Sequence, residues 1–326
     1  MSGRTALVSG VTGFIGKNLA AKLCTHGYRV TALVRPSANR SSLGALHGAV
    51  SFLDADLSDI HGLERQLSRH RWDVVFHLGA IRGVRSITKQ SYFTVNVEAT
   101  EVLGRYARQA GAKLIFCSSV GVYGTTPRIL PPPRDSNFWA DNIYHSTKIE
   151  AEKRLQFLVR RGLACVILRP GITYGTDDYG FPYLLIKLID NGILILPTQP
   201  IQIHLVDVDT LCDAFLASAI RSIESGTVYN VLDANPVMLN DLVDFINFEL
   251  KGRSYPRWKH IPKAFFRLAE ITASLLHNPS WKARFELLSR SWYYDTDAID
   301  TSLGVTQLAT IPNFGKVVNW YKAVRG

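Results

Sequence analysis

A glycine-rich turn near residue 10 is the feature that most constrains the fold of this chain. The segment Gly10-Val11-Thr12-Gly13-Phe14-Ile15-Gly16 follows the apolar run Ala6-Leu7-Val8 and precedes apolar residues at helical spacing. Glycines permit the tight turn and let the backbone approach a pyrophosphate, which then rests on the positive N-terminus of the helix. The spacing is GxxGxxG. It predicts a dinucleotide site with Gly10, Thr12, Gly13, Phe14, Ile15 and Gly16 as cofactor contacts.

Short apolar runs alternate with helical patterns through the first half of the chain. The predicted strands are Ala6 to Val8, Val30 to Val34, Val50 to Leu53, Asp73 to Leu78, Lys113 to Cys117 and Leu163 to Leu168. The predicted helices cover roughly 58–69, 90–111 and 141–161. Strands alternating with helices imply right-handed βαβ units around a parallel sheet. We therefore predict an α/β fold of the Rossmann type, with a doubly wound parallel sheet.

The rhythm loosens after about residue 170. Helices are expected over 184–188, 209–222 and 239–250, strands over 193–196, 202–206 and 226–232, and a mostly helical stretch over the last 75 residues. The sequence predicts a dinucleotide-binding domain over 1–170 and a smaller, mixed, mostly helical substrate subdomain over 171–326. Segments within 201–232 are expected to return to the first domain. The proline-containing segment Thr125 to Asp135 is expected to be a surface loop beside the cleft.

The chain carries 37 Lys and Arg against 27 Asp and Glu, a formal net charge of +10. Such a surplus suits nucleic acid, a membrane surface or a phosphorylated cofactor. Arg35 ends the second predicted strand, 19 residues past Gly16, where Arg accommodates a 2′-phosphate and an acidic residue would bind the ribose hydroxyls. With Arg40 nearby, it favours NADP(H), while NAD(H) stays open. Asp56-Leu57, after the third strand, is placed for the adenine edge.

Tyr144-His145-Ser146-Thr147-Lys148 forms a YxxxK motif on a predicted helix. Residues four apart share a helix face, so Lys148 can lie beside the phenol. A nearby ammonium and a cationic nicotinamide would favour the phenolate and bring its pKa closer to neutral pH. Ser119, one strand earlier, could hydrogen-bond the reacting oxygen.

These motifs make the chain resemble an extended short-chain dehydrogenase/reductase of the NAD-dependent epimerase/dehydratase superfamily. The matching features, in family order over residues 5 to about 235, are Gly10/Gly13/Gly16, Asp56-Leu57, His77-Leu78-Gly79-Ala80, Asn96-Val97, Ser118-Ser119 with Val122-Tyr123-Gly124, Tyr144 with Lys148, Arg169-Pro170-Gly171, and Ile203-His204 with Asp207. The resemblance implies Tyr144 as acid/base, Lys148 as the residue that lowers its pKa and holds the nicotinamide ribose, and Ser119 as a substrate-orienting group. It implies a supporting role for Asn96. Further cofactor contacts follow from it: Leu78, Gly79, Ala80, Ser118, Pro170, Gly171, Ile172 and Thr173.

Departures from the family pattern bear on the reaction. The Asp-Glu pair of the 4,6-dehydratases is replaced by Val120-Gly121, so that activity is not expected. Ile172 stands where nucleotide-sugar 4-epimerases place Asn, and Pro200 where they often place Arg. The strand ending at Arg35 and the segment Leu168 to Gly171 resemble dihydroflavonol-reductase-like and 3β-hydroxysteroid-dehydrogenase-like members. We therefore expect reversible hydride transfer between NADP(H) and a ketone or secondary alcohol of a small molecule.

Several alternatives stay open. A nucleotide-sugar 4-epimerase or 4-keto-sugar reductase is the main one, and a non-catalytic dinucleotide sensor is disfavoured because Tyr144 and Lys148 are both present. The segment Lys263 to Leu276 has an amphipathic pattern, for which packing on the substrate pocket is favoured over membrane binding. The helices near 90–111 and 141–161 form a four-helix dimer interface in many relatives.

Other classes of site and location find little support in the sequence. Lys and Arg look scattered and no recognition motif is visible, so nucleic acid is not expected as a partner. The four Cys have neither disulfide nor zinc spacing, and no metal is expected. His77, His145, His204 and His260 are interpreted as structural or rim residues. With no signal-peptide layout and no long apolar run, a cytoplasmic protein is expected.

Overall fold

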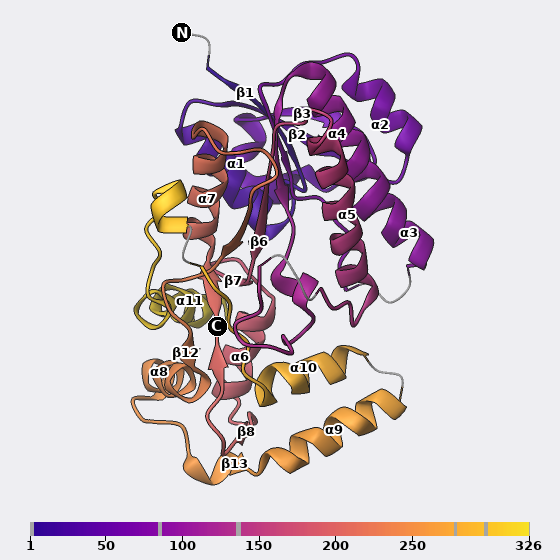
Figure 1. Cartoon of the computed structure of the whole chain (residues 1–326). Coiled ribbons are helices and arrows are strands. Elements are labelled where there is room, and N and C mark those ends of the chain that lie inside the picture. Colours follow the sequence, from indigo (N-terminus) through magenta and orange to yellow (C-terminus); the bar gives the residue numbers. More distant parts are fainter. Residues whose placement is uncertain (1–2, 84–86, 135–137, 277–278, 297–298, 326) are drawn as a thin grey trace.

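A computed structural model describes residues 3–83, 87–134, 138–276, 279–296 and 299–325. Within these ranges, seven parallel strands form one sheet in the order β11-β6-β5-β4-β1-β2-β3 (Figure 1). Their bounds are β1 Thr5–Ser9, β2 Arg29–Val34, β3 Ser51–Asp54, β4 Val74–His77, β5 Lys113–Cys117, β6 Cys165–Pro170 and β11 Val228–Val231. The order reverses between β1 and β4, which is where doubly wound folds bind nucleotides. The predicted Rossmann-type α/β fold is confirmed.

Helices cover both faces of the sheet (Figure 1). One face packs against α1 (Phe14–Thr25) and α7 (Val208–Ile220), and the other against α2 (Ile60–Leu67), α4 (Ala99–Ala110) and α5 (Ile143–Val159). Successive strand residues alternate between the two cores: Ala6 and Val8 join the first, and Leu7 joins the second. Since both faces are buried, the middle of each strand is mostly apolar, as the continuous runs in the sequence suggested, and polar residues stand mainly towards the strand ends.

The helical segment predicted near 90–111 is divided in the structure. It consists of α3 (Lys89–Phe93), a π-helical turn η2 (Thr94–Glu98) and α4. A wide turn shifts the register of the side chains that follow it, and such turns are frequent at functional sites. Asn96 lies within this turn. A 3₁₀ segment, η1 (Arg40–Gly48), was not predicted because its residues lack helical periodicity.

The C-terminal half builds a third apolar core below the sheet (Figure 1). Its elements are β7 Ile172–Tyr174, α6 Phe181–Asp190, β8 Leu196–Pro197, β9 Gln202–Ile203, β10 Leu205–Asp207, β12 Val237–Met238, α8 Leu239–Lys251, β13 His260–Ile261, α9 Lys263–Leu275, α10 Pro279–Ser289 and α11 Thr310–Val324. The expected strand over 193–196 is short, because only β8 pairs, with β13. β11 pairs with β6, and α7 shares a core with α1. The division into two domains stays a prediction.

Several sequence expectations touch the periphery of the fold. All four Cys are free thiols; Cys117, Cys165 and Cys212 are buried, and Cys24 is half-buried. The outer faces of α4 and α5 are joined within the chain by an ion pair of Arg154 with Glu101, at 3.0 Å. The dimer through these helices stays a prediction. Among the described helices, none combines the length and the apolar character needed to cross a bilayer.

Candidate active site

The glycine turn forms a backbone cradle at the switch point of the sheet. Gly10 has a φ of +75°, and a Cβ atom there would lie 2.7 Å from the backbone nitrogen of Gly79 at the end of β4. A Cβ on Gly16 would lie 2.7 Å from the carbonyl carbon of Gly10. Gly13 is the N-cap of α1 and caps no N–H group with a side chain, so the first-turn N–H groups remain open to an anion. The cradle therefore fits a dinucleotide pyrophosphate.

A buried chain of hydrogen bonds supports this cradle from below. The backbone N–H groups of Leu78 and Gly79 donate to Oγ of Ser9, whose hydroxyl lies 2.6 Å from Nδ1 of His77. Nε2 of His77 lies 2.8 Å from Oγ1 of Thr100. Burial lowers the pKa of His77 to about 3, and the neutral ring can accept at Nδ1 and donate at Nε2. His77 is thus structural, and Leu78 to Ala80 border the nucleotide edge.

The far end of the nucleotide edge carries the residues predicted to read the cofactor's ribose. Arg35 is exposed directly after β2. Arg40 instead forms an ion pair with Asp54, and its guanidinium lies 4.8 Å from the centre of the Phe52 ring. Asp56 accepts hydrogen bonds from the N–H and the hydroxyl of Ser58, each at 2.8 Å. The side chain of Arg40 is therefore already engaged, and Arg35 is the freer of the two.

Tyr144, Lys148 and Ser119 come together at the carboxyl end of β5. The Ser119 hydroxyl lies close enough to the Tyr144 phenol to act on its pKa, which it lowers, and it accepts from the N–H of Gly121 at 3.0 Å. Nζ of Lys148 lies 5.8 Å from the centre of the Tyr144 ring and donates to the carbonyl oxygen of Cys117 at 2.7 Å. The sequence motif YxxxK therefore places its two side chains on one face of α5, next to Ser119.

Burial dominates the electrostatics of this trio. It raises the pKa of Tyr144 to about 12, against the opposing positive charge of Arg82. Burial also lowers the pKa of Lys148 to about 8, against the negative character of Cys117 and Glu152. The expected fall in the Tyr144 pKa is therefore not found in the ligand-free chain. Desolvation of the phenolate outweighs the charge of Arg82 here, and the expectation relied in part on a positively charged nicotinamide.

Asn96 fastens the loop after β4 to the catalytic helix. Its Oδ1 accepts from the N–H of Ile81 at 2.8 Å, and its Nδ2 donates to the Ile81 carbonyl and to Oγ1 of Thr147, each at 3.0 Å. Thr147 in turn donates to the carbonyl oxygen of Tyr144. Asn96 thereby holds the segment after Ala80 against α5, an arrangement that fits the predicted supporting role.

The wall formed by the ends of β5 and β6 contains a buried ion pair. Arg169 donates from Nε to Oε1 of Glu152 at 2.9 Å and from Nη2 to Oε2 at 2.6 Å. The hydroxyl of Ser118 also bonds to Glu152. Ser118 was predicted as a cofactor contact. Its hydroxyl is instead occupied by Glu152 inside the wall, so its side chain is not free to contact a cofactor. Pro170, Gly171, Ile172 and Thr173 follow Arg169 along the same wall.

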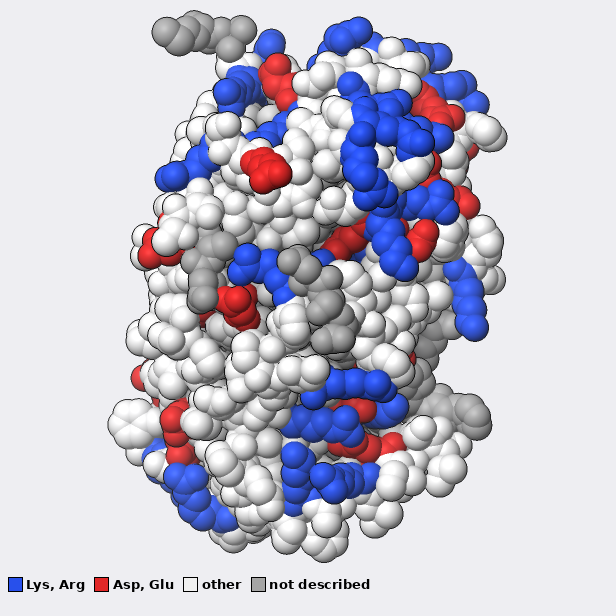
Figure 2. Space-filling model, viewed as in Figure 1, with Lys and Arg blue, Asp and Glu red and all other residues white. Residues whose placement is uncertain are grey.

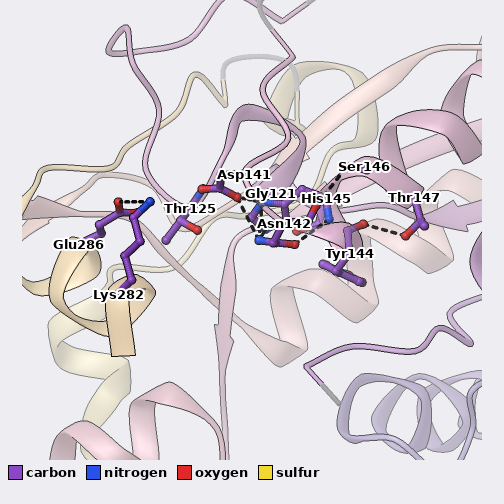
Figure 3. A network of polar contacts seen from close by, with 11 residues as sticks. Gly121, Thr125, Asp141, Asn142, Tyr144, His145, Ser146, Thr147, Lys282 and Glu286 are labelled. Carbon is purple, nitrogen blue, oxygen red and sulfur yellow. Dashed lines mark hydrogen bonds and ion pairs between the residues drawn. The ribbon is translucent and has the colours of Figure 1, made fainter. Parts of the chain in front are cut away.

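Sequence reasoning missed one residue at this site. His145 lies beside Gly121, where a Cβ atom would come within 2.5 Å of Nε2 of the imidazole and 3.1 Å of the Ser119 hydroxyl (Figure 3). Nδ1 of His145 lies 2.6 Å from Oδ1 of Asp141. Burial of Asp141 opposes its charge, but hydrogen bonds from His145 and Thr125 lower its pKa to about 2. Two features of the sequence could have indicated this role. Asp141 stands four residues before His145, and Gly121 leaves space for the imidazole.

An apolar cavity of about 160 Å³ lies under the loop that follows Tyr123. It is lined by Tyr123, Arg128, Ile129, Pro132, Phe138 and Trp139. The guanidinium of Arg128 lies 3.3 Å from the centre of the Trp139 ring. Within the loop predicted over 125–135, Arg128 therefore packs on Trp139, and Asp135 falls outside the described residues. No group of three or more metal-ligating side chains is present in the part of the chain that the structure describes.

Comparison with known proteins places this geometry among its relatives. The model of the "NAD dependent epimerase/dehydratase family" matches residues 6–231. A sterol demethylase protein B of Methylococcus capsulatus is 31% identical over 186 residues, 54% of this chain and 53% of that protein. A UDP-glucose 4-epimerase of Cyamopsis tetragonoloba is 30% identical over 214 residues, 59% of this chain and 60% of that protein. The chain thus spans little more than half the length of these relatives.

The fold is shared along nearly the whole chain with a solved structure. The UDP-glucose 4-epimerase of Thermotoga maritima, solved with UDP-glucose, superposes with a TM-score of 0.77. The match covers 99% of this chain and 100% of the other at 21% identity. At that identity the likeness concerns the fold.

Proposed function

Because the chain belongs to the NAD dependent epimerase/dehydratase family, we propose that it catalyses reversible hydride transfer at a secondary alcohol of a small molecule. The observation that carries the proposal is the trio of Tyr144, Ser119 and Lys148 beside the glycine cradle. When bound, the nicotinamide supplies the hydride acceptor and donor. All other steps fall to side chains of this chain.

Tyr144 is the acid and base of the proposed reaction. In the oxidation direction its oxygen takes the proton of the substrate hydroxyl, and in the reduction direction it returns that proton to the carbonyl oxygen. A pKa raised to about 12 keeps the ligand-free phenol protonated, the form required for reduction. Lys148 supplies the positive charge that stabilises the phenolate, and Ser119 donates a hydrogen bond to the reacting oxygen.

The cofactor is proposed to lie along the nucleotide edge from the glycine turn to Thr173. Gly10, Gly13 and Gly16 would hold the pyrophosphate, and Asp56 with Leu57 the adenine. We propose a preference for NADP(H), supported by exposed Arg35 at the end of β2. Arg40 is less suited than the sequence suggested, because it is paired with Asp54. The family description names NAD, so a preference for NAD(H) is the competing outcome.

A nucleotide sugar is the first candidate substrate. It is favoured by the UDP-glucose 4-epimerase of Cyamopsis tetragonoloba among the relatives. In such a reaction Tyr144 would remove and then return the hydroxyl proton, with the hydride returned to the other face of the same carbon. His145, held by Asp141 beside Ser119, would give the sugar a further polar contact.

A ketone of a less polar molecule is the second candidate. Two residues of this chain favour it: Ile172 and Pro200 replace groups that would contact a nucleotide sugar. The relative named for sterol demethylation is consistent with an apolar substrate.

Two assays separate these candidates. Fluorescence titration with NADPH and NADH gives the cofactor preference. UDP- and dTDP-sugars are then compared with a panel of ketones. An epimerase converts the sugar without net cofactor consumption, whereas a reductase oxidises one NADPH for each ketone. Tyr144→Phe is expected to abolish turnover and keep cofactor binding. Full activity in that variant would refute the mechanism.

A further inference from the structure

Helix α9 is apolar on two opposite faces. Phe266 and Ala273 are buried against the body of the protein. On the other side, Phe265 is 58% exposed, Leu268 61% and Leu275 73%, at the spacing of one helical face. Ile271 and Leu276 add to this face. We name Phe265, Leu268, Ile271, Leu275 and Leu276 the apolar face. Packing of this segment on the substrate pocket stays a prediction for the buried side of the helix, whereas the apolar face is exposed.

The apolar face lies at the outer end of the molecule. α9 forms its lower edge in Figure 1, and α10 lies between α9 and the remainder of the chain. Trp258, before α9, and Trp281, on α10, are also exposed. Exposed tryptophans beside a helical apolar face are typical of segments that sit at a membrane interface.

The segment that contains this face is rich in positive charge. Residues 251–290 hold nine Lys and Arg against two Glu, a surplus of seven, whereas the whole chain has a surplus of ten. Arg267 and Arg284 are exposed. This segment of 40 residues, which includes α9 and α10, is therefore one basic region of the chain, and Figure 2 shows another in the upper part of the molecule.

Both acidic side chains of that segment face inward. Glu270 is buried, with Arg290 and the Ser289 hydroxyl as partners. Glu286 is buried next to Lys282, at 3.9 Å. Figure 2 shows Lys and Arg gathered over α9 and α10, with smaller acidic areas between them. The outward field of this surface is positive.

We infer that the apolar face and its basic surroundings bind the surface of a bilayer that contains anionic lipids. Apolar side chains enter the acyl boundary while Lys and Arg meet the headgroups, and each factor alone gives weak binding. A second copy of this chain is the poorer occupant, because it would oppose one surplus of seven positive charges with another.

The surface adjoins the proposed active site. In Figure 3, Lys282 and Glu286 of α10 lie across from Thr125 and Asp141, beside Tyr144. The charge of Asp141 contributes to raising the pKa of Glu286, after burial, which agrees with this proximity. A chain bound through α9 would therefore hold its cleft near the lipid headgroups.

Co-sedimentation of the full chain with vesicles tests the inference. Vesicles of phosphatidylcholine alone are compared with vesicles that also contain phosphatidylglycerol, at low and high salt. Phe265→Ser with Leu268→Ser removes part of the apolar face, and Phe248→Ser is the matched control because Phe248 is also 58% exposed, on α8. Arg267→Gln with Arg284→Gln tests the charge.

Binding to the phosphatidylglycerol vesicles alone, weakened by salt, is expected. The apolar variant should lose at least tenfold in affinity, the charge variant about fivefold per side chain, and the control nothing. Equal loss in the control overturns the inference, as does binding that ignores lipid charge. Absence of binding together with a dimer dissolved by Phe265→Ser would assign the face to a second copy. Tyr144→Phe should bind vesicles as the parent does, which separates this test from the proposed reaction.

Discussion

The buried ion pair between Glu152 and Arg169 offers the sharpest test of how the active-site wall is held. Its two hydrogen bonds of 2.9 and 2.6 Å leave the guanidinium and carboxylate almost without solvent. Glu152→Gln keeps the shape of the side chain but removes the charge. Arg169 then remains buried without its counter-charge, and one of its N–H groups faces an amide N–H.

Breaking a buried pair in this way costs about 3–5 kcal/mol. For a chain of this length the unfolding entropy converts that loss into a fall in Tm of roughly 4–7 °C. Arg169 also donates to the Tyr123 hydroxyl and to the Arg134 carbonyl, and these bonds cannot replace a negative charge. Urea and thermal unfolding, each followed by circular dichroism, measure the change.

Glu150→Gln is a matched control on the same helix. Glu150 pairs with Arg154 at 3.1 Å, but both side chains are well exposed, so the variant should lose less than about 1 kcal/mol. A double variant, Glu152→Leu with Arg169→Met, should recover most of the stability, because apolar groups of similar volume need no counter-charge. Equal losses in Glu152→Gln and Glu150→Gln would refute the reasoning.

Three further predictions concern backbone space and buried titratable groups. Gly16→Ala should weaken NADPH binding at least tenfold, because the added Cβ overlaps the Gly10 turn. Gly48→Ala is the control, because a Cβ there meets nothing within 4 Å, and it should leave binding unchanged. Fluorescence titration measures both affinities. His77 and His204 have pKa values lowered to about 3 and about 4, so the unfolded chain binds more protons below pH 6.5. Each ring should contribute a loss of about 1.4 kcal/mol of stability per pH unit on acidification towards these values, and His77→Gln should lower the slope in urea titrations by about that amount; an unchanged slope would contradict the burial argument. Lys148 has its pKa lowered to about 8, so between pH 8 and 10.5 it is less protonated in the folded than in the unfolded chain. The stability due to Lys148 should therefore rise by about 3 kcal/mol across that window. The rise should vanish in Lys148→Met, and its persistence would show that another group is responsible.

Local pattern was sufficient for the elements that repeat a simple period. Leu114 to Cys117 are apolar and buried because the strand is covered on both faces, and β5 begins and ends at the predicted residues, Lys113 and Cys117. The glycine turn could be read because a close backbone approach admits only glycine there. The residues of the YxxxK motif share a face for the reason that any pair four apart on a helix does.

Several features of the site depended on contacts between segments far apart in the chain. Arg40 looked available for a phosphate until the fold placed Asp54 beside it, 14 residues away. Ser118 looked available for a cofactor until α5 brought Glu152 to its hydroxyl. His145 was interpreted as a structural or rim residue because the space for its ring is left by Gly121, which lies on a different element.

The sequence by itself determined the parallel sheet, the nucleotide turn and the candidates for acid and base, because each follows from spacing within one element or between neighbouring ones. Only the tertiary structure decided which charges are free, which way the pKa of Tyr144 moves without a ligand, and that α9 leaves an apolar face in solvent. Burial and charge pairing are sums over neighbours from the whole chain. The sequence lists the residues that enter those sums, but it does not show which of them are in contact.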